Sequence, residues 1–329
     1  MHRIARLPLL LLRLLLVVAL LPFLLDVPTA PSASAGDLLA NGAAPGARRI
    51  DVDGTESVVA EAGRAGDPAL LLVHGFGGST FGWRTAMAPL AARGWHVIAI
   101  DLPGFGLSAK DWGRDYGHEA QARFALAVLD RLGVERAVLV GHSMGGNVVA
   151  WMAALAPERV AGLVLVDAAI LSPAAGAPVA DEGPAAALLA APPLRRLGRI
   201  AIRSLFTADT FGTLLRSAFA VQGAATPQTV AGYAASARLE RWDLALLGIV
   251  RDGGGNLLPR PIEEIVGTTP TLILWGAADS WVPLGRGEAL RAVLPAARWV
   301  VLPGVGHVPF EEAPDAFEGA LGDWLAPLR

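Results

Sequence analysis

The sequence contains no cysteine and very little lysine. Without a thiol in 329 residues, disulfide bonds, thiolate metal sites, a cysteine nucleophile and a lipid-modified N-terminal cysteine are excluded. Lys110 is the only lysine, so arginine carries nearly all of the positive charge. The formal net charge is −3, and no basic tract or basic patch interleaved with aromatic residues occurs. We therefore expect no nucleic-acid partner.

The usual motifs for metals, nucleotides and phosphate are also missing. No histidine or carboxylate cluster has the spacing of a metal site. Gly104-Phe105-Gly106 follows an expected strand but opens no helix with an acidic partner, so it is not a dinucleotide fingerprint. The glycine-rich loop from Gly75 to Gly78 lacks the lysine of a phosphate-binding loop. The sequence therefore predicts neither a cofactor nor a metal.

The first 35 residues are predicted to be a targeting segment. A basic start precedes the apolar residues Leu7 to Leu25, which Arg13 interrupts. The run after Arg13 has the length of a signal-peptide core, and Ala33-Ser34-Ala35 offers a cleavage site. We expect export to the cell envelope, as a periplasmic or secreted protein. The alternative is an uncleaved membrane anchor, because Leu7 to Leu25 nearly spans a bilayer if Arg13 snorkels. Residues 36–47 are expected to be a flexible linker.

Strands and helices alternate from residue 48 onward. A turn at Asp53-Gly54 is expected to join the first two strands. The expected strands cover about 48–53, 57–61, 69–73, 95–100, 136–141, 163–166, 271–275 and 298–302, and the expected helices about 80–93, 118–132, 147–156, 284–293 and 314–325. This order predicts an α/β fold with a mostly parallel, doubly wound sheet and a ligand site at the carboxyl ends of the strands.

The alternation stops once, between Asp167 and Thr269. This stretch contains alanine- and leucine-rich pieces but no good strand. It predicts a helical cap, residues 168–269, inserted between two strands of a core formed by residues 48–167 and 270–329. Within the cap, residues 194–206 place apolar side chains near helical spacing and arginines on the remaining face. Such a helix suits a lipid interface, although packing on neighbouring cap helices is the simpler interpretation.

Gly141-His142-Ser143-Met144-Gly145 is the most informative motif. It joins an apolar strand to a helical segment, and a side chain at 141 or 145 would collide with the backbones that meet there. The glycines let Ser143 adopt a strained conformation with an exposed hydroxyl. A glycine-rich turn with an incidental serine is the alternative, which the flanking strand and helix disfavour. A serine hydroxyl becomes a useful nucleophile only when a base is held against it.

Two further strand ends supply an acid and a base. Asp279 follows the strand at 271–275, and His307 follows the strand at 298–302. The chain order Ser143, Asp279, His307 is that of a catalytic triad on a sheet of this kind. His307 would take the proton of Ser143, and Asp279 would fix the tautomer of His307. Asp167 also ends a strand and is the alternative acid. Because only a neutral imidazole can act as the base, we expect the rate to rise between about pH 5 and 8.

The loop after the first parallel strand, His74-Gly75-Phe76-Gly77-Gly78-Ser79, exposes backbone N–H groups. The N–H groups of Phe76 and Met144 are predicted to form an oxyanion hole. An ordinary tight loop is the alternative interpretation. His142 is expected to point away from Ser143, and His74 is expected to hold its own loop by hydrogen bonds.

From about residue 48 to the end, the chain resembles the α/β-hydrolase fold superfamily. The resemblance rests on HGFGGS, DLPGFGLS, GHSMGG, WGAADSWVP and GVGHVPFEEAP, which occur in this order. Within the superfamily, the chain most resembles bacterial serine esterases and lipases with a helical cap and a membrane-directed N-terminus. The resemblance implies the Phe76/Met144 oxyanion hole and a cap over the pocket. A serine nucleophile disfavours the dehalogenase and epoxide-hydrolase branches, which need a carboxylate.

We therefore predict a serine hydrolase that cleaves small carboxylic esters with an apolar portion through an acyl-enzyme. Membrane association through the N-terminus is a further expectation. Carbon–carbon bond hydrolysis and cofactor-free haloperoxidase or perhydrolase chemistry are alternatives on the same triad. The carbon–carbon hydrolases commonly have Trp after the catalytic His, where this chain has Val308. A non-catalytic ligand-binding protein is a third alternative, which the intact set of Ser143, Asp279 and His307 disfavours.

Overall fold

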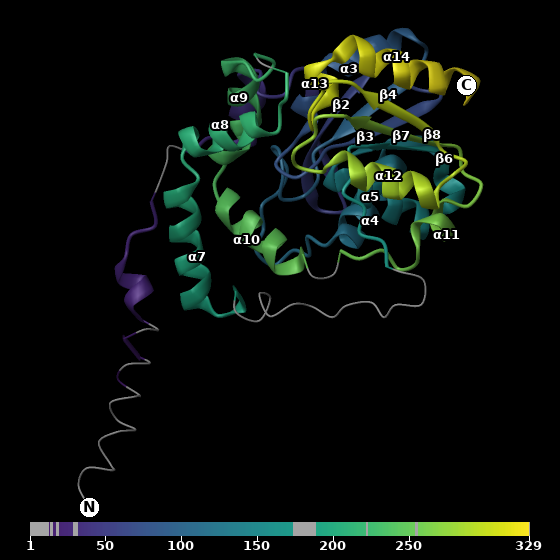
Figure 1. Ribbon diagram of the computed structural model, residues 1–329. Coiled ribbons are helices and arrows are strands. Elements are labelled where there is room, and N and C mark those ends of the chain that lie inside the picture. The colour runs from purple at the N-terminus through teal and green to yellow at the C-terminus, as the bar shows by residue number, and fades with distance from the viewer. Residues whose placement is uncertain are drawn as a thin grey trace, which may run out of the picture.

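The core of the protein is an eight-stranded, mostly parallel β-sheet (Figure 1). The computed structural model describes residues 13, 16–17, 20–28, 32–173, 189–221, 223–253 and 256–328. The strands are β1 (Ala47–Val52), β2 (Thr55–Ala62), β3 (Ala69–Val73), β4 (His96–Ile100), β5 (Ala137–His142), β6 (Val160–Val166), β7 (Thr271–Gly276) and β8 (Arg298–Leu302). Their order is β1-β2-β4-β3-β5-β6-β7-β8; β2 pairs antiparallel with β1 and β4, and all other pairs are parallel.

Helices cover both faces of the sheet (Figure 1). One face carries α3 (Arg84–Ala92), α13 (Pro309–Glu312) and α14 (Pro314–Leu325), and the other carries α4 (His118–Arg131), α5 (Met144–Leu155), α11 (Ile262–Val266) and α12 (Leu284–Val293). All residues of β3, β4, β5 and β7 are buried, which explains why these strands are continuous apolar runs rather than alternating ones. The predicted fold class is confirmed.

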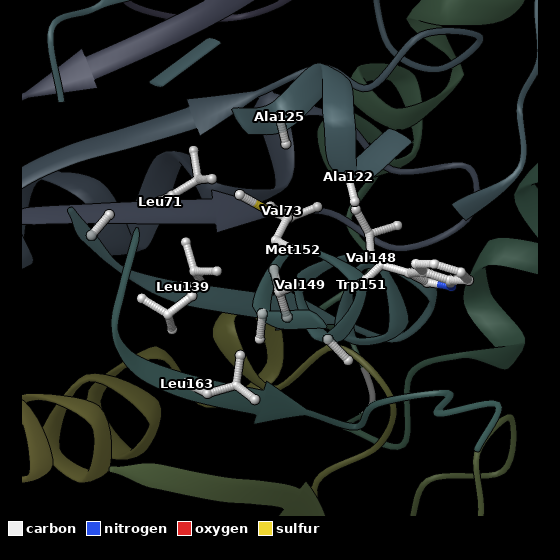
Figure 2. Close-up of a cluster of buried hydrophobic side chains, with 14 of the residues drawn as sticks. Leu71, Val73, Ala122, Ala125, Leu139, Val148, Val149, Trp151, Met152 and Leu163 are labelled. Carbon is white, nitrogen blue, oxygen red and sulfur yellow. The ribbon is translucent and has the colours of Figure 1, made fainter. Parts of the chain in front are cut away.

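One of the apolar clusters of the core lies between the sheet and helices α4 and α5 (Figure 2). Leu71, Val73 and Leu139 project from β3 and β5 toward Val148 and Met152 of α5. These side chains are almost completely buried, and each contributes about 1.5–3 kcal/mol through burial. The strand before Ser143, β5, and the helix after it, α5, are both packed in this core. The turn between them is therefore held in place at both ends.

The cap lies between β6 and β7, and its described residues form helices joined by turns and loops. Its helices are α7 (Pro192–Leu205), α8 (Ala208–Ser217), α9 (Pro227–Ala234) and α10 (Trp242–Asp252), whereas α11, which follows them in the chain, packs on α5 in the core. Residues 174–188 of the expected cap lie outside the described residues. The arginine-bearing face of α7 is used for packing: Arg199 and Arg203 bind the buried carboxylate of Asp243 on α10 at 2.6 and 2.8 Å. Leu205, by contrast, is 66% exposed.

The segment expected to be a flexible linker is partly helical, so that prediction was wrong. Residues 35–40 form α2 (Ala35–Ala40), which begins with a capping box between Ser34 and Asp37. Leu38 is fully buried and packs against Val58, Leu107 and Leu239. The capping box supplies partners for the free N–H groups of the helix start, and Leu38 anchors the helix on the core.

Most of the apolar N-terminal run lies outside the described residues. The part that is described contacts the cap: Arg196 donates hydrogen bonds to the carbonyl oxygens of Pro22 (2.6 Å) and Leu25 (2.8 Å), and Arg203 donates to that of Pro28 (3.1 Å). Within the described ranges, no helix has the length and hydropathy needed to span a membrane. Export and cleavage after Ala35 stay predictions.

His118, at the start of α4, links the fold to acid stability. Its buried Nδ1 accepts a 2.7 Å hydrogen bond from Asn147 of α5, and burial lowers its pKa to about 4. The unfolded chain binds this proton near pH 6.5, so folding stability should fall as the pH drops from about 6.5 to about 4, by at most about 3 kcal/mol for this one group. The free energy of unfolding, measured in urea at pH 7 and pH 4.5, should therefore decrease less between these two pH values in His118→Gln than in the wild type. Equal losses in the two proteins would contradict this assignment.

Candidate active site

Ser143 occupies the sharp turn between β5 and α5. Its backbone has φ +52° and ψ −121°, a strained conformation for a residue with a side chain. A Cβ at Gly141 would lie 2.4 Å from the carbonyl oxygen of Gly145, and one at Gly145 would lie 2.4 Å from that of Val73. The glycines are therefore required for strand and helix to approach this closely, as expected from the sequence.

Asp279 and His307 are brought into direct contact at the ends of β7 and β8. His307 Nδ1 lies 2.7 Å from Asp279 Oδ2, and both side chains are buried. The other carboxylate oxygen, Oδ1, accepts the backbone N–H groups of Trp281 (2.7 Å) and Val282 (2.9 Å). The hydrogen bond to Asp279 assigns the proton of a neutral His307 to Nδ1, and this leaves Nε2 free to accept another proton.

The loop at Gly75 connects Ser143 with the pocket of His307. A Cβ at Gly75 would lie 2.8 Å from the Cβ of Ser143. Gly75 and His307 line the same small pocket, of about 80 Å³. Ser143 therefore lies beside this pocket. The hydrogen bond from Ser143 Oγ to His307 Nε2, which a working triad requires, stays a prediction.

Asp167 ends β6 beside Asp279 but binds elsewhere. Its Oδ1 accepts the backbone N–H of Gly276 at 2.8 Å. Burial raises the pKa of the Asp167 carboxyl well above its usual range, and the nearby charge of Asp279 adds to this effect. A neutral carboxyl is poorly suited to stabilise an imidazolium ion. The geometry thus favours Asp279 over Asp167 as the partner of His307.

The same three side chains are a conceivable metal-ligand set. The candidate ligand atoms of Asp167, Asp279 and His307 all lie within 4.8 Å of one another. A tetrahedral zinc ion with bonds of about 2.0 Å would hold its ligand atoms about 3.3 Å apart. The 2.7 Å separation between Asp279 and His307 is instead that of a charge-assisted hydrogen bond. The arrangement is better suited to proton transfer than to metal binding.

Phe76, one of the two residues of the predicted oxyanion hole, lies in a loop held by His74, and Met144, the other, is the first residue of α5. Nδ1 of His74 donates to the carbonyl oxygen of Gly75 (2.8 Å), and its Nε2 accepts the N–H of Leu102 (3.1 Å). Burial lowers the pKa of His74, which suits a neutral ring in both roles. Within the described part of the chain, the N–H groups of Phe76 and Met144 have no protein acceptor. These two amides are thus available for an anionic oxygen, although their role stays a prediction.

Sequence reasoning gave no role to two residues that contact the His307 loop, His142 and Glu312. His142 Nε2 donates a 2.7 Å hydrogen bond to the backbone oxygen of His307, and the two rings are 4.8 Å apart. Burial lowers the pKa of His142 well below its ordinary value, and the neighbouring His307 ring adds to this effect. His142 therefore supports the histidine loop as a neutral donor. In the sequence, the only indication of a role for His142 is its position in the motif that contains Ser143.

A larger cavity of about 620 Å³ adjoins the pocket of His307, beneath the cap. The two share Phe76, Gly77, Phe206 and Phe211 in their walls. Further lining residues of the larger cavity are mostly apolar and include Phe105, Trp242, Leu246 and Ile249. This volume falls within the range of small-molecule sites, about 300–1,000 Å³.

Comparison with known proteins identifies the family. A family model described as the alpha/beta hydrolase fold matches residues 68–314. The dihydrolipoyllysine-residue acetyltransferase component of the acetoin cleaving system of Pseudomonas putida is 33% identical over 270 residues, or 82% of this chain; the match spans 66% of that relative's length. The 2-hydroxy-6-oxononadienedioate/2-hydroxy-6-oxononatrienedioate hydrolase of Cupriavidus pinatubonensis is 29% identical over 266 residues, covering 79% of this chain and 88% of the relative.

Among solved structures, a membrane phospholipase A described as a bacterial virulence factor is 28% identical. The similarity covers 100% of this chain and 99% of that one, with a TM-score of 0.67. The family model covers three quarters of the sequence, and the structure has the eight-stranded sheet and the serine turn after β5. The chain belongs to the α/β-hydrolase family.

Proposed function

We propose that the protein is a serine hydrolase that cleaves carboxylic esters through an acyl-enzyme. The observation that carries this proposal is the 2.7 Å contact between His307 and Asp279, in a pocket whose Gly75 wall abuts the strained Ser143. This arrangement supplies a nucleophile, a base and a group that orients the base, as nucleophilic catalysis requires.

The reaction begins with attack of Ser143 Oγ on the ester carbonyl carbon while its proton moves to His307 Nε2. The carbonyl oxygen becomes an oxyanion and accepts the N–H groups of Phe76 and Met144. The tetrahedral species collapses, and His307 gives its proton to the leaving alkoxide oxygen. Water then attacks the acyl-enzyme with the same base, releasing the carboxylic acid and restoring Ser143. Asp279 stabilises the imidazolium in both halves.

We further propose that the substrate has an extended apolar portion. The support is the aromatic-lined cavity of about 620 Å³ next to the pocket of His307, together with 28% identity to a membrane phospholipase A. Association with a membrane is part of this proposal. Leu20, Leu21, Phe23 and Leu24 are each at least half exposed, and the segment that carries them binds Arg196 of the cap. Apolar side chains in such a position are suited to a lipid surface.

The test is a series of p-nitrophenyl esters of graded acyl length, from acetate to palmitate, with Ser143→Ala as the control. We expect kcat/KM to increase beyond acetate, because each added methylene enters an apolar cavity. Ala234→Phe, which narrows the larger cavity, should lower the palmitate-to-acetate ratio of kcat/KM. A kcat of Ser143→Ala within about 10²-fold of the wild-type value would contradict the proposed function.

Carbon–carbon bond hydrolysis is the second candidate, because the relative from Cupriavidus pinatubonensis carries the name of a dienedioate hydrolase. Activity on a dienoate without turnover of any ester would favour it over ester hydrolysis. Activity that needs peroxide would instead favour perhydrolysis, and ligand binding without turnover would favour a non-catalytic protein.

A further inference from the structure

Glu312, at the end of α13, is a buried carboxylate that accepts four backbone hydrogen bonds. Its Oε2 accepts the N–H groups of Ala220 (2.7 Å), Val221 (2.9 Å) and Gly306 (3.0 Å), and its Oε1 accepts that of Val308 (3.1 Å). The residue is only 8% exposed. The catalytic scheme proposed above does not use it.

The four donors come from two segments that are far apart in the sequence. Gly306 and Val308 flank His307 directly, whereas Ala220 and Val221 follow helix α8 of the cap. In Figure 1, α13 lies on the side of the sheet nearest α8 and α9. Glu312 therefore joins the histidine loop to the cap.

Further contacts bring the same two segments together. The backbone N–H of His307 donates to the carbonyl oxygen of Ala218 at 2.8 Å. A Cβ at Gly306 would lie 2.6 Å from the nitrogen of Ala220, so only glycine allows this approach. At the neighbouring strand end, Ser280 Oγ donates to the carbonyl oxygen of Ser217 at 3.0 Å. The end of α8 is thus bound to the loops of both Asp279 and His307.

A carboxylate is suited to the position of Glu312, where backbone N–H groups converge on the side chain. An ionised carboxylate only accepts hydrogen bonds, so it can face several N–H donors at once; here three N–H groups converge on Oε2 and one binds Oε1. In the described ranges no arginine, lysine or histidine forms an ion pair with Glu312. A glutamine of the same shape would place an N–H₂ group against one of the four N–H donors. The arrangement therefore requires a carboxylate, not merely a side chain of this size.

We propose that Glu312 is a positioning residue for His307 and couples the histidine loop to the seated cap. The proposal rests on the proposed function, because His307 needs positioning only if it is the catalytic base. With the cap segment 218–221 in place, Glu312 holds the residues on either side of His307, and Nε2 is presented to Ser143. When that segment leaves, two of the four hydrogen bonds are lost and the loop loosens.

The test compares Glu312→Gln with the matched control Glu318→Gln on α14. Wild-type and variant enzymes are first titrated with a serine-reactive phosphonate, so that kcat is expressed per reactive serine. For p-nitrophenyl acetate we expect kcat of Glu312→Gln to fall on the order of 10²-fold with little change in KM, because small misplacements of a catalytic group have effects of this size. The control should keep wild-type kcat. An unchanged kcat per titrated serine in Glu312→Gln would overturn the proposal.

A second readout separates positioning from general loss of folded protein. The charged and titratable groups around His307 are Asp279, Asp167, His142 and Glu312. Removing the negative charge of Glu312 favours neutral His307, so the acid limb of the pH–rate profile should move to lower pH. A purely structural loss would reduce the number of titratable serines and leave the limb in place; that outcome would also overturn the proposal.

Hydrogen exchange of the wild-type protein covers the case in which Glu312→Gln does not fold. The amides of Ala220, Val221, Gly306 and Val308 share one acceptor side chain, so peptides spanning 218–223 and 304–309 should both be protected and should open together. Rapid exchange of 218–223 alongside full protection of 304–309 would overturn the coupling. An absence of ester turnover in the wild type would refute the proposed function while leaving this exchange result to stand.

Discussion

Ser143→Ala is expected to lower kcat on p-nitrophenyl esters by about 10⁶-fold, the size seen when a triad serine is removed from a serine protease. Without Oγ no acyl-enzyme can form, and only substrate binding and the oxyanion hole remain to accelerate attack by water. The measurement is kcat on an ester that the wild type hydrolyses, with circular dichroism to show that the variant is folded. A loss smaller than about 10²-fold would contradict the role of Ser143, since binding and the oxyanion hole alone account for only part of the rate.

His307→Ala provides the matched comparison for this first prediction. Because nucleophile and base act as one unit, the double variant Ser143→Ala/His307→Ala should be no less active than either single variant. Losses that multiply would instead indicate that the two residues act independently. Such additivity would place them in different sites.

Asp279→Asn is expected to lower kcat by about 10⁴-fold, as for the equivalent change in a serine protease. An asparagine amide beside His307 Nδ1 would act as a donor, favour the wrong tautomer and remove the charge that stabilises the imidazolium. Asp167→Asn is the matched control, because Asp167 also ends a strand but binds Gly276 rather than His307. Its carboxyl is already favoured in the neutral form by burial, which raises its pKa.

For Asp167→Asn we therefore expect a loss of less than about tenfold, since the variant keeps the acceptor for Gly276, and burial already disfavours the charged form of the Asp167 carboxyl. Both variants are measured as kcat per serine titrated with a phosphonate. A larger loss for Asp167→Asn than for Asp279→Asn would exchange the roles of the two carboxyls.

Much of the fold followed from local sequence features. Buried parallel strands such as β3 and β5 are short apolar runs. Glycine is needed at 141 and 145, because a Cβ at either position would collide with the backbone where strand and helix meet at Ser143. Strand ends in a parallel sheet lie at one edge, so the chain order of Asp279 and His307 predicted their approach. Choosing Asp279 over Asp167 with certainty required coordinates, because both carboxyls end adjacent strands.

The remaining features depend on tertiary contacts or on a short local pattern. Helix α2 was missed although Ser34 and Asp37 have the spacing of a capping box. The contact between Glu312 and Ala220 joins residues 92 positions apart, and no local pattern encodes it. The arginines of α7 were expected on a charged face, but Asp243 of α10 binds two of them, a pairing set by helix packing.

The most direct test of the account is mass spectrometry of the enzyme quenched in acid during turnover of a slowly hydrolysed p-nitrophenyl ester. The tryptic peptide covering residues 137–159 contains Ser143 as its only hydroxyl side chain. We predict that this peptide gains the mass of one acyl group and that the adduct is absent from Ser143→Ala. Steady ester turnover with no acyl group on this peptide, or with one on another residue, would contradict it.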